Sequence, residues 1–385
     1  MPQTMPAATR KGENTKARLT AACAREIRAR GFCNVSVSDF AARAELAVGG
    51  FYRYYKSKED VLAEMADVLS RDLEGRLAAL DGAAVPELLR AFCAFALKNR
   101  CMYQALREAE FYCPPAAAVF NGRWRRAVAR AVAGTRRPEL ALEIVCGAQY
   151  FWAMRYPVWQ GKPAPEDKLA VSAAIISGGL AAKKVLALEE MAAAASRWTA
   201  HKPAAKPQDA RGKLLQSAQE QFGKRGFYSA PVAEISRRAG LSVGYFYRCF
   251  GSKEDAFRQT TVNLRRTLTG YTASACSGAQ SRLETELRSL SAFFEFIRRN
   301  PQGYRILREA EFVDRALAED YYLGLMRDYA ASMRLTAAGE FATEDYEAAA
   351  FTLMGAGHAL GLKYGGVKPP LAEIAGALFN GILGE

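Results

Sequence analysis

The stretch Val48-Gly-Gly-Phe-Tyr-Arg-Tyr-Tyr-Lys-Ser-Lys-Glu-Asp60 occurs again as Val243-Gly-Tyr-Phe-Tyr-Arg-Cys-Phe-Gly-Ser-Lys-Glu-Asp255, 195 positions later and without a gap. Extended backwards at the same offset, residues 15–60 and 210–255 are identical at 17 of 46 positions. A match of this length indicates an internal repeat, which has to be recognised before any other feature of the chain is interpreted.

A second block confirms that the repeat extends beyond this motif. Tyr103-Gln-Ala-Leu-Arg-Glu-Ala-Glu-Phe111 returns as Tyr304-Arg-Ile-Leu-Arg-Glu-Ala-Glu-Phe312, now at an offset of 201 positions. The repeated charges favour an internal salt bridge, and a polar anchor for a ligand is the alternative. Because the motif and the region after it both recur, we interpret the 385 residues as two copies of one unit fused head to tail.

Helical signals surround the repeated motif. Residues 13–30 have the 3–4 spacing of one apolar helix stripe, and Gly31 follows as the expected end of that helix. Ser36 is a good N-cap for a short second helix, and Asp39 three residues later resembles a capping box. A third helix begins near Ala47 and carries Gly50, Arg53 and Tyr54 on its outer side. Two short helices joined by a tight turn and supported by a longer helix form a helix-turn-helix.

The residues of both copies, Gly-Phe…Val-x-x-(Phe/Ile)-Ala/Ser…Ala-Gly-Leu-Ser-Val-Gly-x-Phe-Tyr-x-x-Phe-x-Ser-Lys-Glu, resemble the DNA-binding signature of the tetracycline-repressor (TetR) family. Residues 239–247 follow it closely. The first copy departs from it at Glu45, where the family has a turn glycine, and at Ala47, where it has a capping serine. Glu45 would be strained if the turn needs a positive φ, and an alanine cap costs about 1 kcal/mol. The second copy departs at Ala230-Pro231, where the family usually has threonines.

The resemblance implies an all-α fold in which each helix-turn-helix head precedes a helical ligand-binding and dimerisation domain. The expected parts are a flexible basic arm (1–12), a first head (13–60), a first helical domain (61–195), a linker (196–209), a second head (210–255) and a second helical domain (256–385). Residues 140–156 and 168–190 are predicted to form two long helices with small-residue faces. With their counterparts, 346–364 and 371–383, they would form the family's four-helix dimer interface within one chain, as a pseudo-dimer. Whether two chains associate further is left open.

The second short helix of a helix-turn-helix lies in the major groove of DNA. The predicted DNA-contact residues of the first copy are Ser36, Val48, Gly49, Gly50, Tyr52, Arg53, Tyr54 and Lys58, and those of the second copy are Ser242, Val243, Gly244, Tyr245, Tyr247, Arg248 and Lys253. Residues 10–60 contain 11 basic and 6 acidic residues, and residues 202–255 contain 10 and 5, so both heads have a basic excess. Since the two helices differ in sequence, we expect an operator with dissimilar half-sites.

In the family, the helices after the head enclose an inducer pocket, so the resemblance also implies an unknown small-molecule effector. The candidate lining residues are Phe92, Phe95, Met102, Arg107, Phe111, Trp124, Phe151, Trp152, Phe293, Phe296, Arg308 and Phe312. For any one of these side chains, a place in the ordinary hydrophobic core is the alternative.

The bulk composition agrees with a nucleic-acid partner. The chain has 53 basic and 40 acidic residues, a net charge of +13 and a pI near 9.4. Eight cysteines without a CxxC pair and only two histidines, His201 and His358, assemble no zinc pattern. We find no HExxH, P-loop or GxSxG motif and expect no enzyme, cofactor or metal site. No signal peptide or membrane-spanning run is recognised, so a cytoplasmic location is expected.

Together these patterns predict a sequence-specific DNA-binding transcriptional regulator, a repressor released from its operator by a small molecule. One alternative is a ligand or protein sensor in which one or both heads are inactive, and Glu45 and Ala47 favour it for the first head. A second alternative is a thiol sensor that uses Cys93, Cys101 and Cys113.

Overall fold

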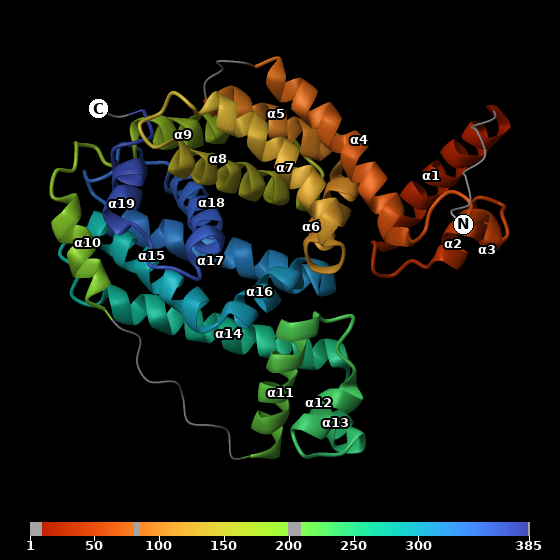
Figure 1. Cartoon of the computed structure of the whole chain (residues 1–385). Helices are drawn as coiled ribbons and strands as arrows, with labels where there is room; N and C mark the ends of the chain where they lie inside the picture. Colours follow the sequence, from red (N-terminus) through yellow and green to blue (C-terminus); the bar gives the residue numbers. More distant parts are fainter. Residues whose placement is uncertain (1–9, 81–84, 199–208, 384–385) are drawn as a thin grey trace. The chain divides into compact units, whose positions relative to one another are not determined.

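The protein is described by a computed structural model that covers residues 10–80, 85–198 and 209–383 (Figure 1). In these residues the chain forms nineteen α-helices and one π-helix, without a strand, so the predicted all-α class is confirmed. Most of the predicted arm (1–12) and linker (196–209) lies outside the described residues. No helix in the described part is long and apolar enough to cross a membrane.

The chain divides into two compact units whose boundaries differ from those of the two sequence copies. The first unit contains Met1–Ala79 and Phe95–Ala127, and the second contains Leu80–Ala94 and Val128–Glu385. The second unit therefore includes the end of the first copy as well as the whole second copy. The reason is that the last helices of the first copy pack against helices of the second copy.

The first unit begins with a three-helix head and continues into longer helices. Its elements are α1 (Arg10–Arg30), α2 (Val37–Arg43), α3 (Val48–Phe51), α4 (Lys58–Ala78), the end of α5 (Val85–Lys98), α6 (Arg100–Tyr112) and most of α7 (Pro114–Ala131). Helix α1 packs against both α2 and α6, so the head and the helices that follow it share a core. Phe40 and Phe51 fill the centre of the head and are fully buried.

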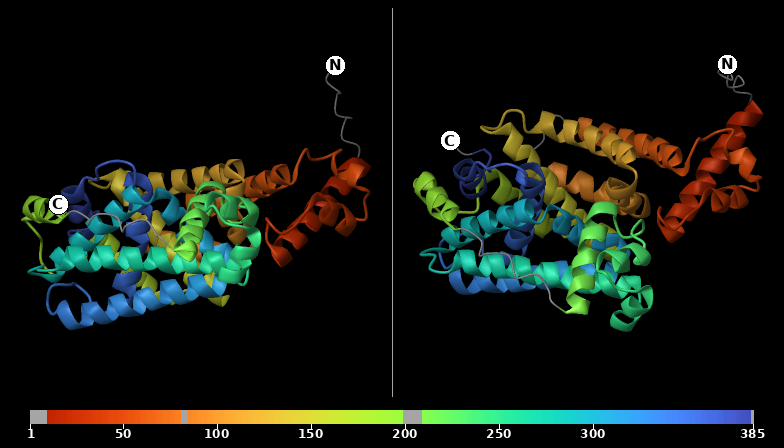
Figure 2. Two further views of the ribbon diagram at one scale, coloured as in Figure 1. Left: turned by 90° about the horizontal axis from the view of Figure 1, so that it is seen from below. Right: turned by 60° about the horizontal axis from the view of Figure 1, so that its bottom comes forward.

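The second unit contains the remaining helices. They are α8 (Pro138–Ala153), the π-helix η1 (Met154–Gln160), α9 (Glu166–Gly178), α10 (Leu188–Ser196), α11 (Ala210–Arg225), α12 (Val232–Arg238), α13 (Val243–Cys249), α14 (Lys253–Cys276), α15 (Arg282–Arg299), α16 (Pro301–Val313), α17 (Arg315–Thr336), α18 (Tyr346–Tyr364) and α19 (Leu371–Phe379). The second head, α11 to α13, is joined to the rest through contacts of α11 with α14 and α16. Helices α14 and α15 pack along each other (Figure 2).

The most extensive helix pair of the second unit is α8 with α18, which come from different copies. Their crossing point is formed by Gly147 and Gly355, and a Cβ atom built on either glycine would overlap the backbone of the other. The two helices can therefore approach this closely only because neither residue has a side chain. Beside this point, the Ser172 and Thr352 hydroxyls lie 2.7 Å apart, and the Trp152 indole N–H donates to Ser172 Oγ at 3.0 Å.

The ends of α9 and α19 exchange backbone hydrogen bonds reciprocally. The N–H groups of Leu180 and Ala181 donate to the carbonyls of Leu378 and Phe379, at 2.9 and 3.0 Å. Those of Ile382 and Leu383 donate to the carbonyls of Ile176 and Ser177, at 3.0 and 3.1 Å. Each donor and each acceptor of the first pair of bonds corresponds to a donor or acceptor of the second pair 202 positions away in the sequence. The exchange therefore has a local two-fold symmetry.

This exchange overturns one of the sequence expectations. Residues 168–190 were expected to form one long helix, whereas α9 ends at Gly178 and α10 begins only at Leu188. Gly179 has a φ of 98°, and its counterpart Gly381 has a φ of 83°, values that favour glycine. The positive φ turns the chain out of the helix and brings the next residues against α19.

We predict that Gly355→Val destabilises the second unit by about 1–3 kcal/mol or more, since the added side chain would overlap the α8 backbone. Thermal unfolding followed by circular dichroism measures the effect. Gly324→Ala is the matched control, because a Cβ on Gly324 in α17 meets nothing within 4 Å. The control is expected to leave stability unchanged or raise it by about 0.5–1 kcal/mol. Equal stability of the two variants would contradict the close crossing.

Candidate nucleic-acid interface and cavity

The second head has a well-capped and exposed third helix. Gly240 takes the positive φ of the turn, at 71°, and Ser242 Oγ accepts a hydrogen bond from the Tyr245 N–H at 3.1 Å. Helix α13 then continues for seven residues. Phe246 is fully buried beneath it, while Val243 and Tyr247 remain 40% and 53% exposed. Since residues four apart share a helix face, this helix presents a continuous outer surface.

The first head builds the same turn from less suitable residues. Glu45 has a φ of 56° and is the only non-glycine residue in the described part of the chain with a positive φ. The strain expected at this position is therefore present, and a left-handed conformation costs a non-glycine residue about 1–2 kcal/mol. Ala47 makes no side-chain cap, and α3 ends after four residues. The third helix is thus shorter than its counterpart in the second head.

Most of the predicted DNA-contact residues lie on the outer surface of their heads. Exposed positions of the first head are Val48, Gly49, Tyr52 and Arg53, and exposed positions of the second are Ser242, Val243, Gly244, Tyr247 and Arg248. Gly50, Tyr54 and Tyr245 are half-buried, and the Arg248 guanidinium lies 5.0 Å from the centre of the Tyr245 ring. Arg53 and Tyr54 were expected within the third helix, but they follow its end.

Besides Ser242, three of the predicted contact residues have structural partners within the heads. The Lys58 ammonium donates to the carbonyls of Phe32 and Val35, both at 3.1 Å, and lies 4.5 Å from the centre of the Phe32 ring. Lys253 lies in the same way over Phe227, at 4.4 Å, and burial lowers its pKa. Both lysines thus fix the loop after the first helix of their head.

Ser36 is the third of these residues, and it forms the predicted capping box. Its hydroxyl accepts from the Asp39 N–H at 3.2 Å, and Asp39 Oδ2 accepts from the Ser36 N–H at 2.7 Å and from the Ser36 hydroxyl at 2.6 Å. The bonds from the Ser36 hydroxyl, from Arg30 and from the Ser36 N–H to the carboxylate lower the pKa of Asp39 to about 2. Contact of Ser36, Lys58, Lys253 and the other predicted residues with DNA stays a prediction.

A repeated glutamate connects each head to the helical region of its copy. The Glu108 carboxylate on α6 accepts from the N–H groups of Phe32 and Cys33, at 2.8 and 3.1 Å. Its counterpart Glu309 on α16 accepts from the Phe227 N–H at 2.8 Å. Both carboxylates are buried. The repeated charges therefore do more than form the expected salt bridge, of which Arg107 and Glu110 are an example. The sequence signal for this role was that Glu108 recurs as Glu309 in the second copy.

The second unit also contains a cavity of about 470 Å³. Its walls come from α14 to α19, with one side chain, Phe151, from α8 of the first copy. Phe151 makes edge contacts with Tyr322, at 5.6 Å between ring centres, and with Phe351 of α18. The cavity thus touches the helix pair that joins the two copies.

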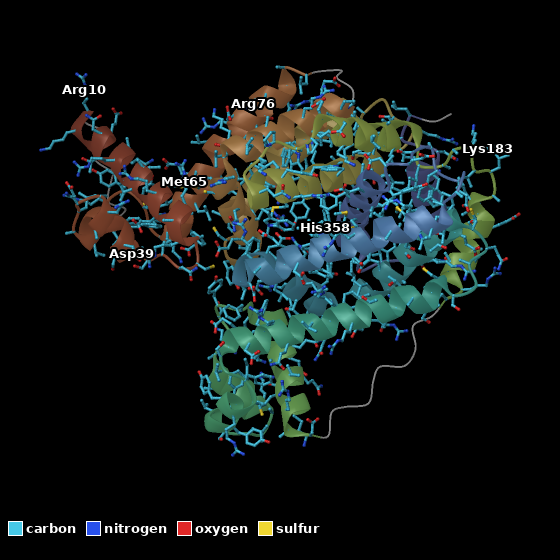
Figure 3. All side chains as sticks on the ribbon, turned by 180° about the vertical axis from the view of Figure 1, so that it is seen from behind. Arg10, Asp39, Met65, Arg76, Lys183 and His358 are labelled. Atoms are coloured by element: carbon cyan, nitrogen blue, oxygen red, sulfur yellow. The ribbon has the colours of Figure 1, made fainter. Side chains whose placement is uncertain are left out.

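Two polar pairs lie in the wall of this cavity. The Tyr304 hydroxyl and His358 Nδ1 are 2.5 Å apart, and Figure 3 shows His358 inside the second unit. The Glu286 carboxylate accepts from the Tyr329 hydroxyl and from Arg282 Nε, the latter at 2.6 Å. Burial raises the pKa of Glu286 and of Tyr329. Sequence reasoning missed the four of these side chains that line the cavity, Glu286, Tyr304, Tyr329 and His358, because their helices meet only in the folded chain.

Residues 19–65 and 214–260 each match the model of a family described as "Bacterial regulatory proteins, tetR family". Both heads therefore belong to the TetR family. The two matches coincide with the two heads, so the chain carries two DNA-binding domains of this family.

Two relatives agree with this result. The HTH-type transcriptional activator FasR of Mycolicibacterium smegmatis is 34% identical over 110 residues, 27% of this chain and 47% of FasR. The uncharacterized HTH-type transcriptional regulator YdgC of Bacillus subtilis is 29% identical over 191 residues, 46% of this chain and 93% of YdgC. The chain spans about half the length of FasR. Nearly all of YdgC matches about half of this chain.

Among the predicted pocket residues, Phe151 and Phe293 line the cavity. The others are not among its lining residues: Phe92, Phe95, Met102, Arg107, Phe111, Trp124, Trp152, Phe296, Arg308 and Phe312. Phe95 stacks on Phe120 in the first copy, and Trp152 is bound to Ser172 beside the helix crossing. Phe111, Arg308 and Phe312 are half-buried and the other seven are buried. A place for these ten side chains in a ligand pocket stays a prediction.

We predict that the double variant Glu45→Gly, Ala47→Ser stabilises the third helix of the first TetR head. Glycine removes the strain of the positive φ, and serine supplies the missing cap, each worth about 1 kcal/mol. Hydrogen exchange of the amides of α3 should slow by about tenfold or more, since local opening becomes less favourable. Gly240→Glu, the reverse change in the second head, should accelerate exchange in α13. Unchanged exchange in both variants would contradict the strain at Glu45.

We predict that Glu309→Ala loosens the second head from α16. The buried Phe227 N–H loses its acceptor, a loss of about 1–3 kcal/mol. The Phe227 amide should then exchange about ten- to a hundredfold faster, while Glu309→Gln, which keeps an acceptor, has a smaller effect. Glu319→Ala on α17 removes only a surface ion pair with Arg315 and should leave Phe227 unaffected. The same protection in all three variants would show that Glu309 does not hold the head.

Proposed function

We propose that the chain is a sequence-specific DNA-binding regulator of transcription whose two unlike heads bind one operator with dissimilar half-sites. The observation that carries the proposal is the pair of exposed third helices with different surfaces. The first presents Gly49 and Gly50 where the second presents Gly244 and Tyr245. A tyrosine at this position fills space in a groove that glycine leaves open, so the two heads would prefer different base pairs.

The fusion supports the use of both heads on one operator. Dimeric helix-turn-helix proteins place two recognition helices about 34–36 Å apart, one turn of DNA. In this chain the helix pair α8–α18 and the exchange between α9 and α19 supply, within one polypeptide, the kind of contacts that would otherwise join two subunits. The chain would act as a pseudo-dimer. Because each head has its own sequence, no symmetry requires a palindromic operator.

A small molecule in the cavity would control this DNA binding. A ligand shifts an equilibrium only by its different affinity for two conformations, and this cavity has walls that connect to both copies. Glu309 joins α16, which contributes Tyr304 to the wall, to the second head. We therefore infer that ligand binding changes the position of this head. Release from an operator that overlaps a promoter makes the protein a repressor, although the relative FasR is named an activator.

A sensor with an inactive first head is the second candidate, and Glu45 and Ala47 are the observations that favour it. A strained turn and a four-residue helix make the first head a weaker reader of DNA. The acidic Glu45 side chain is exposed and would repel a phosphate passing near the turn. In this case the second head alone would provide sequence preference.

We predict strong and salt-dependent binding of the intact chain to duplex DNA. A protein that makes 6–10 phosphate contacts loses about 10³- to 10⁵-fold in affinity between about 50 and 200 mM salt. Fluorescence anisotropy of a labelled duplex, recovered from sheared genomic DNA by its binding to the chain, measures the dependence. Binding that is absent, or indifferent to salt, would contradict the proposal and favour the sensor.

We predict that Arg53→Ala and Arg248→Ala weaken different halves of the operator. Each arginine is exposed in its head, and loss of a base contact costs about 1–3 kcal/mol, roughly five- to a hundredfold in affinity. The duplex recovered above is tested with either half replaced by random sequence. If the first head is inactive, only Arg248→Ala has an effect, and if both variants affect the same half, the assignment of one head to each half is wrong.

A further inference from the structure

We propose that the cavity of the second unit binds one elongated, lipophilic organic cation per chain. This inference rests on the proposed function only in taking the cavity as the effector site, and it names the chemistry of that effector. The argument uses the shape of the cavity, the charge of its walls, its aromatic side chains and the difference between the two copies.

The lining residues show that the cavity is longer than it is wide. Along α15 they extend from Glu286 to Phe293, and along α17 from Tyr321 to Ser332. At 1.5 Å of rise per residue, these stretches are about 10 and 16 Å long. The volume of about 470 Å³ is within the range of sites that enclose one small organic ligand. An extended molecule with an apolar body fits these dimensions better than a compact one.

The charged side chains in the described lining are both acidic. Glu286 is buried, and its charge is compensated by Arg282. Arg282 is not a lining residue, and it donates hydrogen bonds to Glu286, Ser332 and Thr336. Asp328 is exposed and makes no hydrogen bond or ion pair with the described residues. No lysine or arginine of the described chain lines the cavity. The uncompensated charge of the wall is therefore negative, which favours a cation and disfavours a carboxylate or phosphate.

Aromatic rings supply the second element of cation recognition. The lining includes the tyrosines Tyr304, Tyr321, Tyr322 and Tyr329 and the phenylalanines Phe151 and Phe293. Aromatic faces attract organic cations, most strongly where water is excluded. One face of Tyr321 is already occupied, because the Arg265 guanidinium lies 4.1 Å from the ring centre, so the other rings of the lining would receive the ligand. A soft cation with attached apolar groups would gain from both the rings and the leucines of the wall.

The first copy has no acidic residues at the corresponding positions. At the offset of 201 that relates α5 to α15, α6 to α16 and α7 to α17, Glu286 corresponds to Val85 and Asp328 to Ala127. Leu325 corresponds to the larger Trp124. The groups that would select a cation thus occur in one copy, so the expected stoichiometry is one cation per chain.

The test compares two probes with the same alkyl chain and opposite charge, dodecyltrimethylammonium and dodecanoate, by isothermal titration calorimetry on the intact protein below their micelle concentrations. We expect one cation to bind per chain and dodecanoate to bind at least about tenfold more weakly. Asp328→Asn should weaken cation binding about three- to tenfold. Asp320→Asn, an exposed aspartate of the same helix outside the lining, should not change it.

A third variant tests the location of the site without removing a charge. Leu325→Trp introduces the side chain found at the corresponding position of the first copy and should obstruct cation binding. Equal or tighter binding of dodecanoate, binding of neither probe, two cations per chain, or no effect of Asp328→Asn would each overturn the inference.

A parallel anisotropy measurement with bound duplex DNA separates this inference from the proposed function. If the cation binds with the expected selectivity but DNA remains bound, the cation site is supported and the proposed control of DNA binding by this cavity is wrong. If dodecanoate releases the DNA and the cation does not, a ligand-controlled regulator stands and the cation inference fails.

Discussion

The close contact of Gly147 with Gly355 is the constraint on which the second unit depends. It lets α8 of one copy and α18 of the other approach until their backbones touch, and the reciprocal bonds between α9 and α19 follow beside it. Helices from two halves of the sequence thereby share one core. In a homodimer every substitution occurs in both subunits, whereas in this fused chain each copy can change without the other.

The two copies have used this freedom in different places. The first head retains the outline of the turn but places Glu45 at the positive φ that Gly240 supplies in the second head. The second copy places Glu286 and Asp328 at a cavity where the first has Val85 and Ala127. The second copy thus combines the better-capped head with a cavity lined by two acidic residues, and Glu309 connects that head with α16.

The sequence predicted features that depend on neighbouring residues or on the repeat itself. The all-α class, the two family units, the capping role of Ser36 and Ser242 and the strain at Glu45 all come from local signals. Features that depend on distant contacts were missed or wrong. Glu108 binds backbone 75 and 76 residues away, and the helix predicted at 168–190 breaks because the chain turns at Gly179 toward α19. Only two of the predicted pocket residues, Phe151 and Phe293, line the cavity. A sequence does not distinguish a large apolar side chain of the core from one that lines a cavity.

Selection of binding sites from random duplex DNA with the intact chain tests most directly whether two unlike heads act as one regulator. The account predicts a single bipartite motif, with half-sites about one DNA turn apart and different in sequence. Recovery of perfect palindromes alone would contradict it, because a palindrome requires two equivalent heads. Recovery of one isolated half-site would contradict it in another way, by showing that only one head reads DNA.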